Sequence, residues 1–165
     1  MASFTLTSRL AGLILAVCVI TTFPSHAFAQ GTNPFIGVWT LNVAKSTFSP
    51  GPPPKSQTRT YTQNGDGLKL VQTGVTADGS ASVPSGWAVH FDGKDYPSVG
   101  NPANDMVTAT MTAASTLDTT FKKGGKVTGT RRFTVSKDGK TMTSWNGGTN
   151  NAGLPVSNFT VWTKQ

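Results

Sequence analysis

The stretch of sequence that decides the fold runs from residue 33 to residue 42. It reads Asn33-Pro34-Phe35-Ile36-Gly37-Val38-Trp39-Thr40-Leu41-Asn42. A turn with a proline leads into a strand in which Phe35, Gly37, Trp39, Leu41 and Val43 share one parity. The pattern predicts a strand over 35–44 in which Gly37 and Trp39 are structural, because a large aromatic ring on an inward parity usually fills a core.

Tight turns punctuate the rest of the chain. Asx-Gly and Gly-Gly pairs, which supply the positive φ that short hairpins need, separate Thr- and Val-rich runs. The strands predicted between them cover 35–44, 57–63, 68–76, 81–91, 106–112, 116–123, 126–136, 140–146 and 155–164. No run has a sustained helical period. The predicted fold class is therefore all-β, a single antiparallel up-and-down β-barrel of eight to ten strands, whose closure removes exposed edges.

Two segments interrupt this rhythm. The proline-rich run over 49–54 cannot join a ladder, so it predicts an extended connection across one barrel end. Residues 95–105 hold two prolines and Gly100, and they predict an irregular loop at the rim.

The first 29 residues have the pattern of an export signal. Arg9 gives a positive start, residues 10–22 are an apolar run, and Ala27-Phe28-Ala29 is a small-x-small cleavage site. This pattern predicts a signal peptide over 1–29, cleavage before Gln30 and one domain over 30–165. The expected location is the periplasm or the medium, with no stable membrane insertion, because the apolar run is too short for a stop-transfer helix.

The alternative is a lipoprotein acylated at Cys18. Val17 stands against it, because a small residue normally precedes such a cysteine. Cleavage before Gln30 would also remove Arg9, leaving 13 basic and 7 acidic residues, a net charge of +6. It would remove Cys18 and His26 as well, so the mature chain has no thiol and His90 is its one imidazole. Neither a disulfide nor a His-cluster metal site is expected, and no cofactor.

Alternation also assigns the inward faces of the later strands. Inward parity falls on three sets: Val83, Trp87, Val89 and Phe91; Leu117, Thr119 and Phe121; and Val127, Gly129, Arg131, Phe133 and Val135. Arg131 is thus a cation on an apolar parity, which is costly unless an anion or carbonyls meet it. Three explanations stay open. A bulge near Gly129 turns Arg131 outward, or Arg131 bonds backbone carbonyls, or it contacts a ligand.

Several strings near the C-terminus accompany the opening Gly37-Val38-Trp39. They are Lys123-Gly124-Gly125-Lys126, Arg131-Arg132-Phe133, Lys137-Asp138-Gly139-Lys140 and Phe159-Thr160-Val161-Trp162-Thr163-Lys164-Gln165. Together they resemble the lipocalins and fatty-acid-binding proteins (calycins), and the chain is similar to small exported bacterial lipocalin-like proteins. The resemblance implies that Trp39 packs across a closed barrel end, often under a late Arg or Lys.

The resemblance further implies a binding protein for a small hydrophobic or amphipathic ligand, without chemistry. Fatty-acid binders hold the carboxylate with Arg-x-Tyr on the last strand, where this chain has Thr160 and Trp162. Arg131 is left as the candidate partner of an anion. The lid helices of that family are replaced by the proline-rich run. The candidate ligand-binding residues are Arg131, Tyr61, Trp87, Phe91, Met111 and Phe121, of which the five apolar ones line a cavity or form a filled core.

The sequence leaves two other classes of function open. A hydrolase or isomerase at the barrel mouth would have to use Asp95, Asp105, Asp118 or His90, since the chain has no Glu, and the parity of His90 points outward. Outward Lys122, Lys126, Arg132, Lys137 and Lys140 could instead form a basic face for anionic envelope polymers or lipids. Nucleic acid is not an expected partner of an exported chain, and the oligomeric state is left open.

Overall fold

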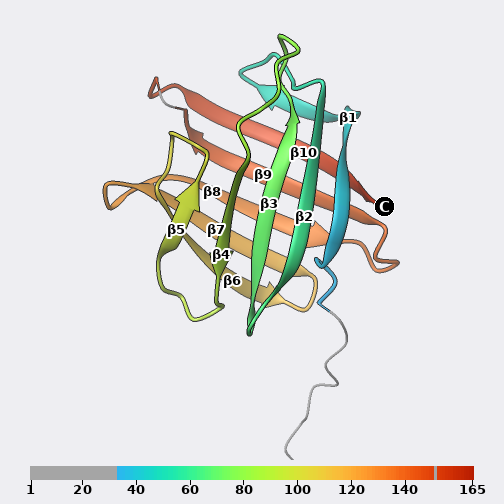
Figure 1. The fold of residues 1–165 in the computed structure, drawn as a ribbon, viewed down its shortest axis with the longest axis vertical. Coiled ribbons are helices and arrows are strands. Elements are labelled where there is room, and N and C mark those ends of the chain that lie inside the picture. Colours follow the sequence, from blue (N-terminus) through green and yellow to red (C-terminus); the bar gives the residue numbers. More distant parts are fainter. Residues whose placement is uncertain (1–32, 151) are drawn as a thin grey trace, which may run out of the picture. The chain divides into compact units, whose positions relative to one another are not determined.

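A computed structural model describes residues 33–150 and 152–165, and the predicted signal peptide and Cys18 lie outside these residues. The described residues are all-β (Figure 1). The strands are β1 (Gly37–Ser49), β2 (Ser56–Asn64), β3 (Gly67–Val75), β4 (Ser85–Val89), β5 (Tyr96–Val99), β6 (Met106–Ala113), β7 (Thr116–Lys123), β8 (Lys126–Val135), β9 (Thr141–Thr149) and β10 (Pro155–Lys164). In this part of the chain no helix is long and apolar enough to cross a membrane.

The ten strands form one closed antiparallel barrel, as predicted. Each strand pairs with its neighbours in sequence, and β1 closes the barrel by pairing with both β10 and β2. Every connection is therefore a hairpin or a short loop, which is what the Asx-Gly and Gly-Gly turns favour. The end with the β2–β3 and β6–β7 turns is called the closed end below, and the end with the β7–β8 and β9–β10 turns the open end.

Two strand predictions need correction. The segment 95–105, predicted as an irregular loop, contains the short strand β5. β5 pairs with β6 at Tyr96–Val107 and Pro97–Met106. The predicted strand over 81–91 is shortened to β4, and Val83, predicted inward, is 71% exposed. An isolated bridge joins Ala81 to Val75, so the chain before β4 bends away from the ladder instead of continuing it.

A bulge between β7 and β8 explains a third difference. Phe121 pairs with Gly129, but Lys122 pairs with Val127, so Thr128 is an extra residue on β8. The extra residue changes which side chains face inward only in the part of β8 that precedes it. Val127, predicted inward, is therefore 61% exposed, whereas Arg131 and Phe133 keep their inward positions.

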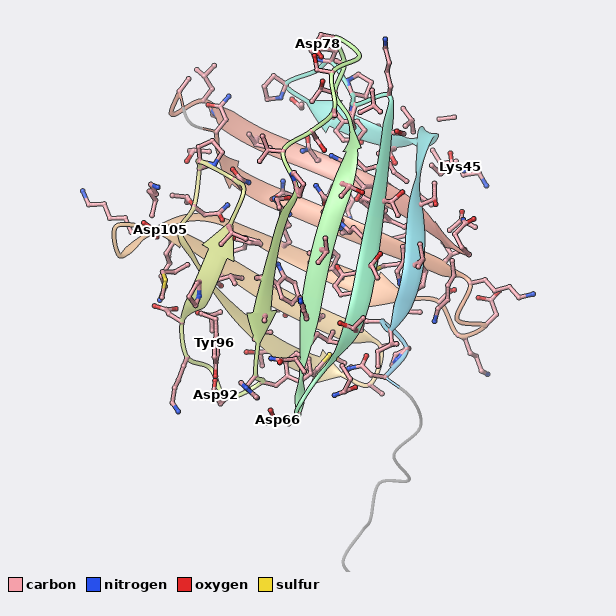
Figure 2. All side chains as sticks on the ribbon, viewed as in Figure 1. Lys45, Asp66, Asp78, Asp92, Tyr96 and Asp105 are labelled. Atoms are coloured by element: carbon pink, nitrogen blue, oxygen red, sulfur yellow. The ribbon has the colours of Figure 1, made fainter. Side chains whose placement is uncertain are left out.

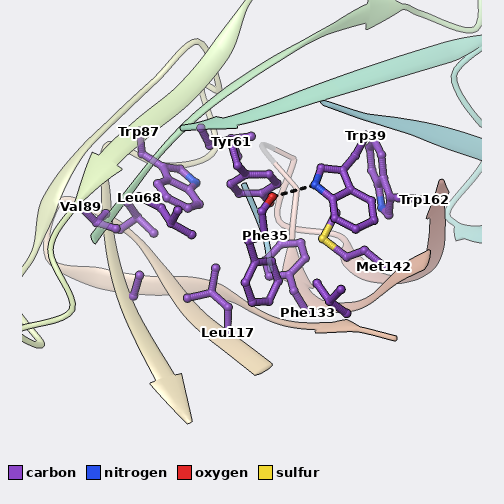
Figure 3. Packing of buried hydrophobic residues seen from close by; sticks show 14 of the residues in the cluster. Phe35, Trp39, Tyr61, Leu68, Trp87, Val89, Leu117, Phe133, Met142 and Trp162 are labelled. Carbon is purple, nitrogen blue, oxygen red and sulfur yellow. Dashed lines mark hydrogen bonds between the residues drawn. The ribbon is translucent and has the colours of Figure 1, made fainter. Parts of the chain in front are cut away.

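The closed end is filled by a core of buried aromatic and aliphatic side chains (Figure 3). Trp39 is fully buried there, and its indole Nε1 donates to the Phe35 carbonyl at 2.8 Å. The Lys164 ammonium of β10 lies 5.1 Å from the centre of the Trp39 ring and donates to the Pro34 carbonyl. Gly37 has a φ of 132°, and a Cβ there would meet Lys164 Cε at 2.7 Å. The positive φ favours glycine at this position, and a Cβ would displace the end of the lysine that covers the tryptophan.

Candidate ligand-binding site

The open half of the barrel is hollow where the closed half is packed. Three adjoining hollows of about 230, 110 and 40 Å³ lie there. Residues of β7, β8, β9, β10 and the β5–β6 loop line the largest of the three, and residues of β1, β2, β3, β8, β9 and β10 line the second. Arg131 lines all three hollows. The barrel interior is therefore hollow on the open-end side of Arg131 and packed on the closed-end side.

Arg131 is held inward by β8, where it pairs with Thr119 on β7 and Asn146 on β9. Its guanidinium carbon lies 4.6 Å from the centre of the Phe121 ring, a distance typical of a cation–π contact. Its Nε is buried and has no hydrogen-bond partner. In the described part of the chain, no backbone carbonyl accepts a hydrogen bond from this side chain. The geometry therefore leaves contact with a ligand or with water as the way to meet its charge.

Arg59 on β2 is a second inward arginine, which the sequence analysis missed. It is 5% exposed, and its Nε donates to the Gln72 Oε1 of β3 at 2.7 Å. Its guanidinium carbon lies 4.0 Å from the centre of the Trp162 ring and 5.2 Å from that of Phe133. Gln72 and the rings fix its position, while its terminal NH1 stays buried without a partner. The signal was available, because Arg59 shares the parity of Tyr61, two residues later.

Burial disfavours the charge of both arginines, and Arg59 further disfavours that of Arg131. Burial lowers the pKa of Arg59, and burial together with the nearby Arg59 lowers the pKa of Arg131 to about 10. Burial raises the pKa of the Tyr61 phenol, whose hydroxyl is also buried without a partner. An anion between the guanidinium groups would relieve the repulsion and satisfy their free N–H donors.

No carboxylate of the chain supplies that anion. All seven acidic residues are described, and Asp66, Asp78, Asp92 and Asp105 lie at turns and loops on the periphery (Figure 2). Asp95, Asp118 and Asp138 are bound to Lys122, Arg132 and Ser136. None of the three hollows is lined by an acidic residue among those described. The interior carries two positive charges without a protein counter-ion.

The predicted ligand-binding residues fall into two groups. Arg131 and Phe121 line the largest hollow, and both also line the smallest one together with Trp87. Tyr61 is fully buried in the core and packs edge-on against Phe35 and Trp87. Phe91 and Met111 are partly buried, pack against the core and line none of the three hollows.

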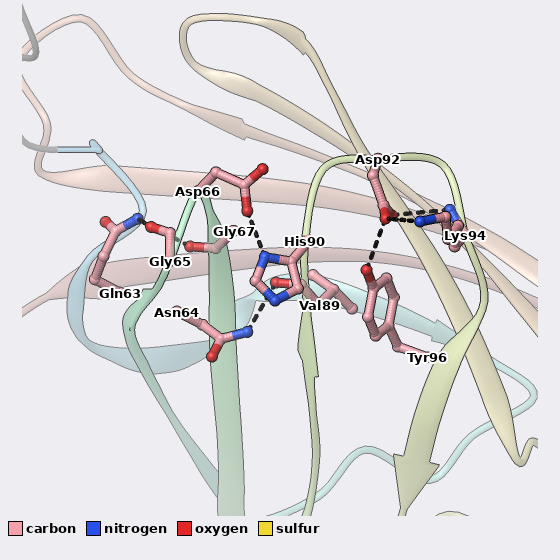
Figure 4. Close-up of polar contacts among 10 residues, drawn as sticks. All are labelled: Gln63, Asn64, Gly65, Asp66, Gly67, Val89, His90, Asp92, Lys94 and Tyr96. Carbon is pink, nitrogen blue, oxygen red and sulfur yellow. Dashed lines mark hydrogen bonds and ion pairs between the residues drawn. The ribbon is translucent and has the colours of Figure 1, made fainter.

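The side chains considered for catalysis lie outside the barrel interior. His90 is bound to Asp66 and lies beside the Tyr96 ring, whose hydroxyl donates to Asp92 at 2.9 Å (Figure 4). Lys94 pairs with the same Asp92 at 3.1 Å. In residues 33–150 and 152–165, no group of three or more His, Cys, Asp or Glu side chains is arranged to hold a metal ion.

Solved structures match this chain at low sequence identity. Rv2717c from M. tuberculosis matches with 13% identity and a TM-score of 0.49, covering 80% of this chain and 93% of that chain. Zebrafish ileal bile acid-binding protein, complexed with cholic acid, matches with 14% identity and a TM-score of 0.46, covering 80% and 99%. Lobster apocrustacyanin A1 matches with 16% identity and a TM-score of 0.42, covering 82% and 63%.

No protein-family model matches the sequence, and no curated protein matches it. The class of protein is accordingly defined by the strand order of the chain itself. The described residues form a closed antiparallel barrel that is packed at one end and hollow and basic at the other.

Proposed function

We propose that the protein binds a small organic anion in the open half of its barrel, without performing chemistry on it. The observation that carries the proposal is the pair of inward arginines. Arg59 and Arg131 line one hollow together, both keep buried N–H donors unpaired, and no carboxylate among the described residues meets them. An anionic or amphipathic ligand satisfies these groups, whereas a purely apolar ligand leaves two desolvated charges unmet.

Substitutions of Arg131 and of its outward neighbour Arg132 provide the test. Octanoate and 1-octanol have chains of the same length but differ in charge, and Trp162 beneath Arg59 reports binding through its fluorescence. We expect octanoate to lose affinity by about thirtyfold or more in Arg131→Leu, the loss typical of a desolvated charged hydrogen bond, while octanol is unaffected. Arg132→Leu is the control, because Arg132 points outward and pairs with Asp118. Equal effects of the two substitutions on octanoate binding would contradict the proposal.

The basic-face alternative gains less support from the structure. Of the five outward cations considered for it, Lys122 is paired with Asp95 and Arg132 with Asp118. These pairs neutralise part of the face that would have to attract an anionic polymer.

We further propose that the barrel is exported as a cleaved product. The support is the sequence pattern before Gln30. N-terminal sequencing of protein recovered from the producing cells should begin at Gln30. An acylated Cys18 at the N-terminus would instead make the protein a lipoprotein.

A further inference from the structure

The largest of the three open-end hollows is lined by more polar side chains than apolar ones. Its amide and hydroxyl side chains are Asn101, Asn104, Thr128, Asn146, Thr149 and Asn150, and its apolar ones are Ala103, Phe121 and Val156. Each amide offers donors and an acceptor, and so does each hydroxyl group of a ligand. The Oδ1 atoms of Asn101, Asn104 and Asn150 already accept hydrogen bonds from the protein. An alkyl chain placed here would leave the remaining polar groups without partners, which costs affinity.

Asn104 and Asn146 are available for such bonds. Asn104 is 6% exposed, and its Oδ1 accepts from Ser98 Oγ at 2.6 Å. Its NH2 group has no partner among the described residues, and neither does the amide of Asn146. Asn146 pairs in register with Arg131 on one side and Asn158 on the other, and it lines both of the larger hollows. A group bound by Arg131 therefore has an amide donor and acceptor beside it.

The size of the space sets a second limit. The first hollow holds about 230 Å³ and the second about 110 Å³, so together they lie at the lower end of the roughly 300–1,000 Å³ that drug-sized ligands occupy. A single six-membered ring with its substituents suits this space better than a long acyl chain.

We infer that the ligand is a hydroxylated anion of monosaccharide size, a sugar acid. Its carboxylate would lie between Arg59 and Arg131 in the second hollow, and its hydroxyl groups would bond Asn146, Asn104 and their neighbours in the first. This inference rests on the proposed function and narrows it, because it assigns chemistry to the uncharged part of the ligand. The larger amide-lined hollow thus selects for hydroxyl groups, and the arginines select for charge.

Three probes separate these two contributions. D-Glucuronate has a carboxylate and hydroxyl groups on a six-membered ring, cyclohexanecarboxylate has the carboxylate alone, and D-glucose has the hydroxyl groups alone. Calorimetric titration of the full chain should give glucuronate an affinity at least tenfold above that of either other probe. Asn146→Ala should weaken glucuronate by about threefold to tenfold, the value of one hydrogen bond, and leave cyclohexanecarboxylate unchanged. Thr143→Ala, on the outward parity of the same strand, is the control and should change neither.

The outcomes distinguish this inference from the function on which it rests. If cyclohexanecarboxylate binds as tightly as glucuronate, the sugar-acid inference is overturned while anion binding stands. If glucose binds as tightly as glucuronate, the role of the arginines is overturned. If neither carboxylate binds, both proposals fail. Because the three-probe comparison uses the unaltered chain, it is decisive even if Asn146→Ala does not fold.

Discussion

The two inward arginines lower the stability of the fold while they provide the proposed anion site. An unpaired buried charge costs folding free energy, and replacing a buried charge with an apolar side chain of similar volume is often stabilising. Met has a flexible apolar chain that can occupy the space of the Arg131 stem against Phe121. We expect Arg131→Met to raise the free energy of unfolding by about 1 kcal/mol or more, measured by urea denaturation, while it abolishes anion binding.

Arg132→Met provides the comparison for that experiment. Arg132 is exposed and donates to both carboxylate oxygens of Asp118, at 2.8 and 2.7 Å. Its replacement removes a surface ion pair, so stability should stay the same or fall slightly, and binding should persist. A large loss of stability in Arg131→Met would show that the arginine is a structural element of the barrel and would argue against a binding role.

Trp39 is the residue on which the closed end depends. Its ring is fully buried, its Nε1 is bonded to the Phe35 carbonyl, and Lys164 covers it. We expect Trp39→Ala to lower the free energy of unfolding by about 3–5 kcal/mol, because it leaves a large cavity and an unpaired carbonyl. Coinciding urea midpoints for the variant and the parent would contradict its assignment to the core.

At the scale of strands, alternation predicted the barrel from sequence and failed where the ladder is irregular. β7 and β10 were predicted with their observed bounds, because regular alternation and Gly-rich turns define both ends. β5 was missed because a four-residue strand that contains Pro97 has the composition of a loop. The inward set on β8 was wrong at Val127, since the bulge at Thr128 is set by pairing with β7 and not by a local signal.

The same limit applies to the site. Arg131 was identified because a charge on an apolar parity is conspicuous in one strand. Arg59 was missed because Tyr61 is the one apolar residue on its strand and gives only a weak alternation. Gln72 was missed because its role depends on the pairing of β2 with β3. The amides of the open end come from β9 and from the loops that follow β5 and β9, and sequence alone does not show that these segments meet.

β5 makes the fewest ladder pairs with its neighbours among the strands described. In the described residues β4 and β5 pair only at Gly86–Val99 and Trp87–Ser98, and β5 pairs with β6 only at its first two residues. Few ladder hydrogen bonds protect this segment, so it should open at a lower free energy than the longer strands. Hydrogen exchange should therefore be at least tenfold faster for the amides of β5 than for those of β7 and β8. Equal protection would show that the barrel opens only by global unfolding.

Asp92 fastens the loop between β4 and β5 and makes it sensitive to acid. Hydrogen bonds from the Lys94 backbone and side chain and from the Tyr96 hydroxyl lower the pKa of Asp92 to about 2. Because the unfolded chain then binds protons more readily than the folded chain, this contribution to stability is present above about pH 4 and is lost as the pH falls through 2. Asp92→Asn should reduce the decline in the free energy of unfolding over this range, measured by urea denaturation at each pH. Parallel curves for the variant and the parent would contradict this role of Asp92.

At the scale of the whole barrel, charge is segregated by sign. The aspartates lie at turns and on outward faces, where they pair with surface cations or backbone amides, whereas the hollow interior holds guanidinium groups. Placing acids outside keeps them from neutralising Arg59 and Arg131. The interior therefore has a positive potential, which a low-dielectric wall strengthens and which favours the entry of anions.

This arrangement determines how binding should depend on pH. The ionisable groups at the arginine layer are Arg59, Arg131 and Tyr61, and His90 lies outside with Asp66. Burial lowers the pKa of Arg131 to about 10, so its guanidinium stays protonated at pH 9 and below, and the raised pKa of Tyr61 keeps the phenol neutral there. We expect the affinity for a carboxylate ligand, measured by calorimetry, to be constant between pH 6 and 9 and to fall as the pH rises through about 10. His90→Ala should leave this profile unchanged. Loss of carboxylate binding in His90→Ala would place the anion site at the outer His90 and Asp66 pair instead of inside the barrel.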